Sequence, residues 1–517
     1  MTPEAAPERP PERIDRIAAR LAEAAADRPV LVDAAGRSLS GVELEAAVEA
    51  AAGALRGLGV RGGDRVVLVS ENGVAAAVLA LALSRLDSWT VLVNARLTAS
   101  ELDAIRAHAR PRLTVHTVGI SDAAAAHAGR DGGRPLELRG MDAVTATPAE
   151  PAEPEPVAAR GREQVAALIY TSGTTGRPKG VMLTHANLAF VAAVSGRLRR
   201  LGPADVAYGV LPITHVFGLA SVFLGTLSYG GLLRLVPRFD AEAAARSLAE
   251  DGVTVFQGVP AMYARLLELA GRRGGSLPAP RLRYLSAGGG PLDLALKRRV
   301  EALWGIPLHN GYGLTETAPT VTTTRIEDPA PDDSAGPPIP GVEVRITGPG
   351  TDRDLPAGEI GEIRVRGPNV MKGYYRDPEQ TAAVLRPDGW CRTGDLGRLD
   401  GRGNLYVVGR LKELIIRSGF NVYPPEVEAA LGAHPDVALA AVIGGRTAGG
   451  NEEVLAFVQP VAGRWPDMDE LRRHAAAHLA PYKRPSRIVL IEALPATPAG
   501  KVLKARLAEQ VRAGVHG

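Results

Sequence analysis

The stretch LIYTSGTTGRPKGVMLTH, from Leu168 to His185, places a glycine- and hydroxyl-rich loop between two apolar segments. Glycine allows backbone amides to approach an anion closely, and successive amides can surround phosphate oxygens. Hydroxyl side chains and the positive charge of a lysine favour the same kind of ligand. A strand that leads into such a loop therefore predicts a phosphate-binding site. The residues that would form it are Thr171, Ser172, Gly173, Thr174, Thr175, Gly176 and Lys179.

Two better-known glycine-rich patterns do not apply to this chain. It contains no G-x-x-x-x-G-K-[ST] sequence, so the loop is not a Walker A motif. The stretch GLGVRG at 57–62 matches G-x-G-x-x-G, but a predicted helix precedes it and a predicted strand follows. That order is the reverse of what a dinucleotide site needs. Taken alone, the loop after Tyr170 could still be a merely polar surface loop.

The composition indicates a globular protein with more than one domain. The chain has 517 residues, more than one hydrophobic core usually supports. Its 60 basic and 57 acidic side chains give a net charge of +3, which offers no argument for nucleic-acid binding. Cys391 is the only cysteine, so no internal disulfide and no zinc site are expected. With no apolar signal segment at the N-terminus, these features predict a cytoplasmic protein.

One segment, from Val206 to Leu233, is long and free of Asp, Glu, Lys and Arg. Its length would suffice to cross a bilayer. However, Pro212, His215 and several glycines interrupt it, and such residues suit a buried helix with turns better. We therefore expect no transmembrane segment.

Helical and strand patterns alternate along most of the chain. The helical stretch at 41–59 precedes the strand 64–70, and the same alternation returns at 241–270 and 281–309. Such alternation predicts an α/β fold with layers around largely parallel sheets. Beyond about residue 325 short strands indicate a β-rich subdomain, and beyond residue 425 a compact α+β pattern follows.

Five motifs occur in a defined order along the chain. Together they resemble the motif set of the adenylate-forming superfamily, which includes acyl-CoA synthetases, peptide-synthetase adenylation domains and luciferases. The resemblance covers nearly the whole chain, and SGFNVYPPEVEAAL and MKGYYRDPEQTAAV are most similar to bacterial fatty-acyl and aryl-CoA ligases. The five motifs are YTSGTTGRPKG (170–180), HNGYGLTE (309–316), WCRTGDLG (390–397), VVGRLKELI (407–415) and TPAGKVLK (497–504).

The resemblance implies an acid–CoA ligase that works in two steps. A carboxylate attacks the α-phosphate of ATP to give an acyl-adenylate and pyrophosphate, and CoA then takes the acyl group. Because the first step brings two anions together, it needs cations and hydrogen-bond donors. The implied cofactors are ATP, Mg²⁺ and coenzyme A, and the implied partner is a small-molecule carboxylic acid.

The resemblance also assigns a role to each motif. The loop 171–179 would hold the β- and γ-phosphates, Lys501 would bridge the acid and ATP, and Thr315 would reach the α-phosphate. Glu316 would bind Mg²⁺ with its carboxylate, together with Thr175. Tyr312 would stack on adenine, Asp395 would accept the ribose hydroxyls and Arg410 would donate to ribose or phosphate. The remaining nucleotide contacts would come from Gly288, Gly289, Gly311 and Gly313.

Read alone, several of these residues have simpler interpretations. Asp395 could be a turn residue, and Glu316 could be a carboxylate at a helix start. Lys501 could be a solvated lysine, and His215 could be a satisfied core histidine. The joint occurrence of Asp395, Glu316 and Lys501 in the five motifs favours the functional interpretation, and the resemblance implies a place for His215 at the acid site.

The second step implies a mobile C-terminal domain. The expected division is 1–409 for the N-terminal domain and 410–517 for the C-terminal domain, with Lys412 at the hinge. Rotation there would remove Lys501 and bring Arg417 and Gly419 to coenzyme A. Ser418 precedes this glycine where some relatives carry a lysine.

The expected acid pocket carries no charge that would bind a second carboxylate or an amino group. Gly313 stands where acetate-type relatives have Trp, which predicts room for a larger acid. A medium-to-long fatty acid and an aromatic acid both remain open. So do two other classes, an acyl-AMP ligase that loads a carrier protein and an inactive binding homologue. The expected lining residues are His215, Val216, Phe217, Gly218, Ser221, Val259 and Leu314.

Overall fold

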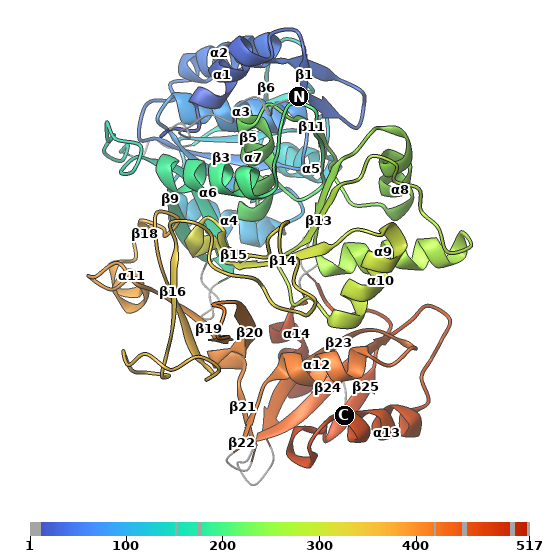
Figure 1. The fold of residues 1–517 in the computed structure, drawn as a ribbon. Coiled ribbons are helices and arrows are strands. Elements are labelled where there is room, and N and C mark those ends of the chain that lie inside the picture. The colour runs from blue at the N-terminus through green and yellow to red at the C-terminus, as the bar shows by residue number, and fades with distance from the viewer. Residues whose placement is uncertain are drawn as a thin grey trace.

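The computed structural model describes residues 12–149, 153–172, 178–417, 420–446, 452–496 and 502–513. Two eight-stranded sheets form the larger part of the molecule (Figure 1). The first has the strand order β15-β14-β13-β12-β10-β11-β1-β2. Its strands are β1 (Pro29–Asp33), β2 (Ser38–Ser40), β10 (Val206–Gly209), β11 (Leu232–Leu235), β12 (Val255–Gly258), β13 (Tyr284–Ala287), β14 (Leu308–Gly313) and β15 (Thr320–Thr323).

The second sheet has the order β18-β9-β8-β4-β3-β5-β7-β6. The central strands of both sheets pair in parallel, as the helix–strand alternation predicts, whereas the edge strands pair antiparallel. Its strands are β3 (Arg65–Ser70), β4 (Trp89–Asn94), β5 (Leu113–His116), β6 (Arg134–Leu136), β7 (Val144–Pro148), β8 (Val165–Ser172), β9 (Pro178–Thr184) and β18 (Gly373–Tyr374).

Helix α3 (Val74–Arg85) is buried along every residue except Arg85. It contacts β1 of the first sheet and β3 and β4 of the second. An all-round apolar helix of this kind belongs inside a protein, and here it joins the two sheets. The other helices of this part are α1 (Arg16–Ala24), α2 (Gly41–Gly57), α4 (Ala99–Ala109), α5 (Asp122–Arg130), α6 (His185–Leu198), α8 (Ala241–Glu250), α9 (Pro260–Arg272) and α10 (Leu294–Trp304).

The apolar segment 206–233 is folded inside the protein. It contains β10, the π-helix η1 (Phe217–Leu224), the short helix α7 (Gly225–Ser228) and the first half of β11. η1 packs against α6, and seven of its eight residues are buried. Within the described residues, no helix combines the length and apolar character that crossing a bilayer requires. π-helices are rare and often occur at functional sites, so η1 marks this region as a candidate functional site.

A third, four-stranded antiparallel sheet has the order β16-β17-β19-β20. The β-rich subdomain expected after residue 325 is therefore confirmed. Helix α11 (Pro378–Val384) precedes β19 in the chain, and the 3-10 turn η2 (Thr315–Thr317) lies earlier, between β14 and β15. Its strands are β16 (Glu343–Thr347), β17 (Gly361–Arg366), β19 (Cys391–Leu399) and β20 (Leu405–Arg410).

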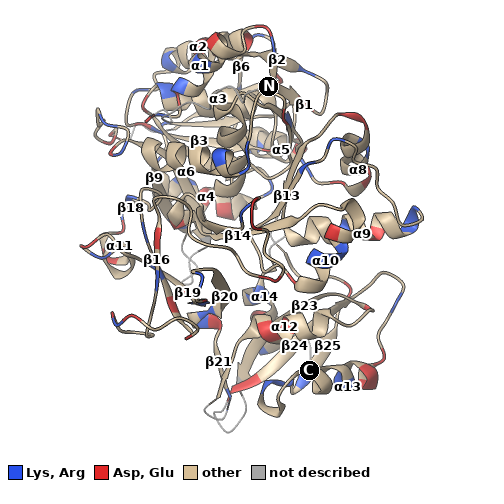
Figure 2. Cartoon of the chain, in the orientation of Figure 1, with Lys and Arg blue, Asp and Glu red and all other residues tan. Residues whose placement is uncertain are grey.

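The C-terminal part, orange to red in Figure 1, lies below the rest and has its own small sheets and cores. The 3-10 turn η3 (Leu411–Glu413) leads into it from β20. The α+β pattern expected after residue 425 is found, while the boundary at 410 stays a prediction. Figure 2 shows basic and acidic residues mixed along both parts. The elements are β21 (Ile415–Arg417), β22 (Phe420–Val422), α12 (Pro424–Gly432), β23 (Val437–Arg446), β24 (Glu452–Pro460), α13 (Met468–His478), η4 (Pro481–Lys483), β25 (Arg487–Leu490) and α14 (Lys504–Arg512).

Candidate active site

The predicted phosphate loop joins two antiparallel strands of the second sheet. In the β8–β9 hairpin Thr171 is paired with Lys179, and Ser172 with Pro178. β8 also pairs in parallel with β4, so one arm of the hairpin is built into the sheet. The hairpin therefore holds Thr171 and Lys179 opposite each other at the mouth of the loop. The predicted residues Gly173, Thr174, Thr175 and Gly176 lie outside the described residues.

Lys179 is held by one residue of β18 and one of α11. Its Nζ donates to Oε1 of Gln380 at 2.7 Å and lies 5.1 Å from the ring centre of Tyr374. A cation over an aromatic face is attracted by the ring, and α11 supplies the glutamine. The ammonium group is thus oriented by two residues that sequence reasoning did not single out.

Tyr374 also contacts the predicted metal ligand. Its hydroxyl donates to Oε1 of Glu316 at 2.8 Å. Burial, and then the negative charge of Glu316, raise the pKa of Tyr374 far above its usual value. The phenol therefore stays protonated and remains a donor to the carboxylate. Glu316 is further fixed through its backbone, because the amide of Met371 donates to its carbonyl at 2.9 Å.

The surroundings of Glu316 fit Mg²⁺ bound mainly by a nucleotide. Among the described residues no group of three or more His, Cys, Asp or Glu side chains could enclose a metal ion. Mg²⁺ typically takes one or two carboxylates, with phosphates and waters completing its octahedron. A single carboxylate that borders a cavity meets that requirement, and Thr315, beside it in η2, is buried.

Tyr312, Asp395 and Arg410 form one connected group. The hydroxyl of Tyr312 donates to Oδ2 of Asp395 at 2.7 Å, and Nε of Arg410 lies 3.0 Å from Oδ1. Asp395 and Arg410 face each other in the β19–β20 pairing. Burial, followed by the charge of Asp395, raises the pKa of Tyr312 well above its usual range. Because a carboxylate has about four acceptor positions, Asp395 keeps capacity for further donors such as ribose hydroxyls.

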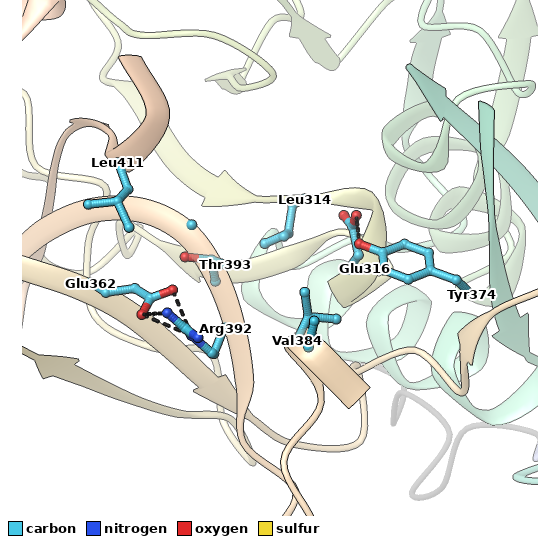
Figure 3. A pocket seen from close by; sticks show the side chains of 10 residues that line it. Leu314, Glu316, Glu362, Tyr374, Val384, Arg392, Thr393 and Leu411 are labelled. Atoms are coloured by element: carbon cyan, nitrogen blue, oxygen red, sulfur yellow. Dashed lines mark hydrogen bonds and ion pairs between the residues drawn. The ribbon is translucent and has the colours of Figure 1, made fainter. Parts of the chain in front are cut away.

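A cavity of about 260 Å³ extends from the metal candidate Glu316 to Leu411 at the start of η3. Figure 3 shows Glu316 and Tyr374 at one end and the ion pair between Glu362 and Arg392 at the other. Leu314, which we expected in the acid pocket, lines this cavity as well. The lining residues are Leu314, Glu316, Glu362, Tyr374, Ala383, Val384, Arg392, Thr393, Gly394 and Leu411.

Four of the predicted acid-site and nucleotide-site residues lie together. A Cβ placed on Gly288 would be 2.9 Å from Cε1 of Phe217, so the ring lies directly against this glycine. A Cβ on Gly289, whose φ is +75°, would be 3.6 Å from Cγ1 of Val259. The segment SAGGG (286–290) therefore places its backbone beside Phe217 and Val259.

The other predicted acid-site residues in η1 and just before it have different environments. Val216 and Ser221 are fully buried, and the hydroxyl of Ser221 lies 3.2 Å from that of Thr320. His215 is exposed, so the alternative of a core histidine is wrong, and its Nδ1 accepts from the amide of Phe217 at 3.3 Å. Its role at the acid site stays a prediction.

The inference drawn from Gly313 is wrong. A Cβ at this position would lie 1.9 Å from the carbonyl oxygen of Pro319, so no side chain fits here. The glycine is required by the close approach of two backbone segments, and its presence gives no information about the size of the acid.

We therefore expect Gly313→Ala to destabilise the protein without changing its choice of acid. Forcing a methyl group against backbone typically costs about 1–3 kcal/mol. Thermal unfolding, with relative kcat/KM values for a short and a long acid, measures both effects. Gly271, where a Cβ would meet nothing within 4 Å, provides the matched control Gly271→Ala. An altered preference at full stability would restore the original inference.

The predicted coenzyme A and hinge residues lie between β20 and β22. Lys412 is exposed in η3. Arg417 donates through Nη1 to the carbonyls of Tyr482 and Arg484, at 3.3 and 2.7 Å, which ties its guanidinium to the C-terminal domain. Gly419 and Lys501 lie outside the described residues.

Lys504 fastens the last helix to the 3-10 turn η3. Its Nζ lies 3.3 Å from a carboxylate oxygen of Glu413 and 2.7 Å from one of Glu428. Glu413 is the last residue of η3, and Glu428 belongs to α12. One ammonium group therefore joins three elements of the C-terminal part.

Comparison with known proteins agrees with this arrangement. A family model described as AMP-binding enzyme matches residues 18–375, and one described as AMP-binding enzyme C-terminal domain matches 426–501. The chain belongs to the AMP-binding enzyme family. This confirms the predicted adenylate-forming superfamily and its α/β fold.

Relatives of this AMP-binding enzyme are ligases. A feruloyl-CoA synthase from Amycolatopsis is 38% identical over 91% of this chain and 93% of its own length. A 4-coumarate–CoA ligase-like protein of Arabidopsis thaliana is 32% identical over 93% of this chain and 88% of its own. The crystal structure of ATP-bound MatB from Rhodopseudomonas palustris has a TM-score of 0.82 and 35% identity, and covers 96% of this chain and 98% of its own.

Tyr374 is the main site residue of this AMP-binding enzyme that the sequence did not disclose. The segment MKGYYRDPEQTAAV carries part of the family resemblance, but its two tyrosines look alike in the sequence. In the structure their hydroxyls donate to two different glutamate side chains. Tyr374 donates to Glu316, and Tyr375 donates to Glu155 at 2.6 Å.

This difference provides a test. We expect Tyr374→Phe to raise the Mg²⁺ concentration needed for half-maximal activity about tenfold, because outer partners of metal ligands typically matter by 10–100-fold. Calorimetric titration of the enzyme with Mg²⁺–ATP in the absence of acid should show the same weakening. Tyr375→Phe, which removes the same atom from the adjacent residue, should leave this binding unchanged. Equal effects of both variants would rule out a specific role for the Tyr374 hydroxyl.

Proposed function

We propose that this protein is an ATP-dependent, AMP-forming acid–CoA ligase that acts on an aromatic acid of the cinnamate type. The observation that carries the proposal is the cavity shared by Glu316 and the 393–394 segment. The β8–β9 hairpin places Lys179 beside Tyr374, which borders the same cavity. Lys179, Glu316 and the residues just before Asp395 therefore lie at or beside one cavity, which supports their joint action on a nucleotide.

The first step needs charge neutralisation at the α-phosphate. Lys179 would hold the terminal phosphates, and Glu316 would orient the Mg²⁺ that neutralises them when bound. Asp395, kept in place by Tyr312 and Arg410, would fix the ribose and with it the α-phosphate. Lys501 would supply the cation between acid and phosphate. Precise placement of this kind accounts for much of the acceleration in phosphoryl and adenylyl transfer.

The choice of an aromatic acid rests on two supports. Feruloyl-CoA synthase and 4-coumarate–CoA ligase relatives each align with about nine-tenths of this chain. Phe217, Val259, Gly288 and Gly289 lie together and carry no polar side chain, which suits an aromatic ring. A fatty acid is the second candidate, because a long-chain-fatty-acid–CoA ligase of Bacillus subtilis is 37% identical over 68% of this chain.

A screen of pyrophosphate release with and without CoA tests the proposal. The panel should contain ferulate, 4-coumarate, benzoate and saturated acids from acetate to palmitate. We expect CoA-dependent turnover to be highest with the cinnamates. Highest turnover with a saturated acid would replace the aromatic substrate by the fatty one. Acyl-AMP formation without thioester formation would instead favour transfer to a carrier protein.

We also propose a cytoplasmic location, because ATP and CoA, the two cosubstrates of the proposed reaction, are supplied there. Fractionation of the producing cells, followed by detection of the protein in the soluble cytoplasmic fraction, tests this.

A further inference from the structure

We propose that Asn72 is a positioning residue for the acid pocket, which it controls by holding the loop 209–213 that leads into η1. The proposal rests on the function proposed above. The side-chain hydrogen bonds of Asn72 go to this loop, so it would act on the pocket through the loop.

Asn72 is 2% exposed, and its side-chain amide is fully engaged with the loop. Its Nδ2 donates to the carbonyls of Gly209 and Leu211, both at 2.9 Å. Its Oδ1 accepts from the amide of Ile213, also at 2.9 Å. Three hydrogen bonds to alternate residues of one short loop fix both the path of its backbone and its distance from Asn72. Buried amides and carbonyls that lose such partners are costly, so the loop has a strong preference for this position.

The contact crosses from one sheet to the other. Asn72 follows β3 of the second sheet, and the loop follows β10 of the first. The preceding residue, Glu71, pairs with Arg238 beyond β11 at 2.8 and 3.0 Å. Glu71 and Asn72 therefore join the carboxyl ends of two strands of the other sheet, the edge where α/β proteins bind their ligands. Of the two, only Asn72 holds the loop that enters η1.

The position of the loop is passed to the pocket through Gly218. A Cβ on Gly218 would lie 2.1 Å from the carbonyl oxygen of Pro212 and 2.5 Å from that of Leu211. The first turn of η1 thus rests directly on the backbone that Asn72 holds. Phe217, the neighbouring residue, lies against Gly288. Because packed interiors do not compress, a shift of the loop has to move Phe217 relative to the glycine backbone.

Asn187 offers a matched comparison elsewhere in the same domain. Its Nδ2 donates to the carbonyls of Pro368 and Val370 at 2.7 and 2.9 Å, and its Oδ1 accepts from the amide of Thr184 at 2.9 Å. The number and type of bonds equal those of Asn72. The loop that it holds leads toward Tyr374 and not toward η1.

The experiment compares Asn72→Ala, Asn72→Asp and Asn187→Ala with the unaltered enzyme. For each, KM and kcat are measured for ATP and for cinnamate, 4-coumarate and ferulate, together with the unfolding temperature. We expect Asn72→Ala to lower kcat/KM for the acids by roughly tenfold or more and to change their ranking, because small displacements of a binding surface have effects of this size. KM for ATP should stay within about twofold, a change too small to indicate a lost contact.

The two other variants separate positioning from fold stability. Asn72→Asp keeps the acceptor for Ile213 but directs a carboxylate oxygen at two carbonyls, so its effect should equal or exceed that of Asn72→Ala. Asn187→Ala should lower the unfolding temperature comparably and leave the ranking of acids unchanged.

Several results would overturn the inference. These are an unchanged ranking in both Asn72 variants, an equal change in Asn187→Ala, or failure of both Asn72 variants to fold, which would assign the contact to fold stability alone. The proposed function fails separately, if the unaltered enzyme forms no acyl-AMP from any of these acids.

Discussion

Replacing Lys501 with alanine should abolish acyl-AMP formation and spare thiolysis of supplied acyl-AMP. Lys501 belongs to the TPAGKVLK motif and is expected between the acid and the α-phosphate only in the first step. Losing a charged donor to a transition state costs about 3–4 kcal/mol, or roughly 10²- to 10³-fold in rate. Single-turnover pyrophosphate release measures the first step, and CoA-thioester formation from synthetic acyl-AMP measures the second.

The second measurement serves as the internal control, because it shows that the variant is folded and binds acyl-AMP. Lys501→Arg keeps the charge but replaces a compact ammonium group by a planar guanidinium group. Its adenylation rate should therefore lie between that of the unaltered enzyme and that of Lys501→Ala. An alanine variant that forms acyl-AMP at the unaltered rate would show that another group bridges acid and phosphate.

The second large effect is expected from Lys412→Pro, which should preserve adenylation and stop thioester production. Lys412 is the second residue of the 3-10 turn η3, where the φ of proline near −65° is tolerated. The arrangement in which Arg410 contacts Asp395 should therefore survive. A large rotation about this residue needs other φ values, which proline forbids.

Pyrophosphate release in a single turnover, measured beside steady-state thioester formation, separates the two steps. Lys412→Ala removes the same charge without restricting the backbone, and it should support both steps. Parallel losses in Lys412→Pro would mean that the residue is structural. Full activity would place the pivot elsewhere in the chain.

Much of the fold follows from hydrophobic patterns in the sequence. Alternating helices and strands predicted the parallel centres of the two large sheets, and the short strands after 325 predicted the β-rich subdomain that contains β16, β17, β19 and β20. The π-helix at 217–224 was not predictable, because its apolar run fits an ordinary buried helix equally well. The antiparallel pairing of the edge strands was not predicted, because the hydrophobic pattern of a strand does not indicate the direction in which it pairs.

The site was predictable where a motif joins residues that are adjacent in the chain. Glu316 came from such a motif, but its partner Tyr374 is 58 positions away and needs the fold to reach it. Asn72 was missed likewise, because its loop is more than 130 positions away. The inference from Gly313 was wrong because the space beside a glycine depends on which backbone segment packs against it. Here that segment contains Pro319, and the sequence does not show this contact.

The contact between Lys504 and Glu413 has a consequence for the order of events in the cycle. Glu413 directly follows the proposed pivot, and Lys504 lies three residues after Lys501. Arg417 is bonded to the same domain through the carbonyls of Tyr482 and Arg484. A rotation of the C-terminal part about Lys412 would consequently withdraw Lys501 and bring Arg417 to the site in a single motion, because both residues would move together. The two half-reactions would then exclude each other in time, and CoA could not compete with the acid for the adenylating arrangement.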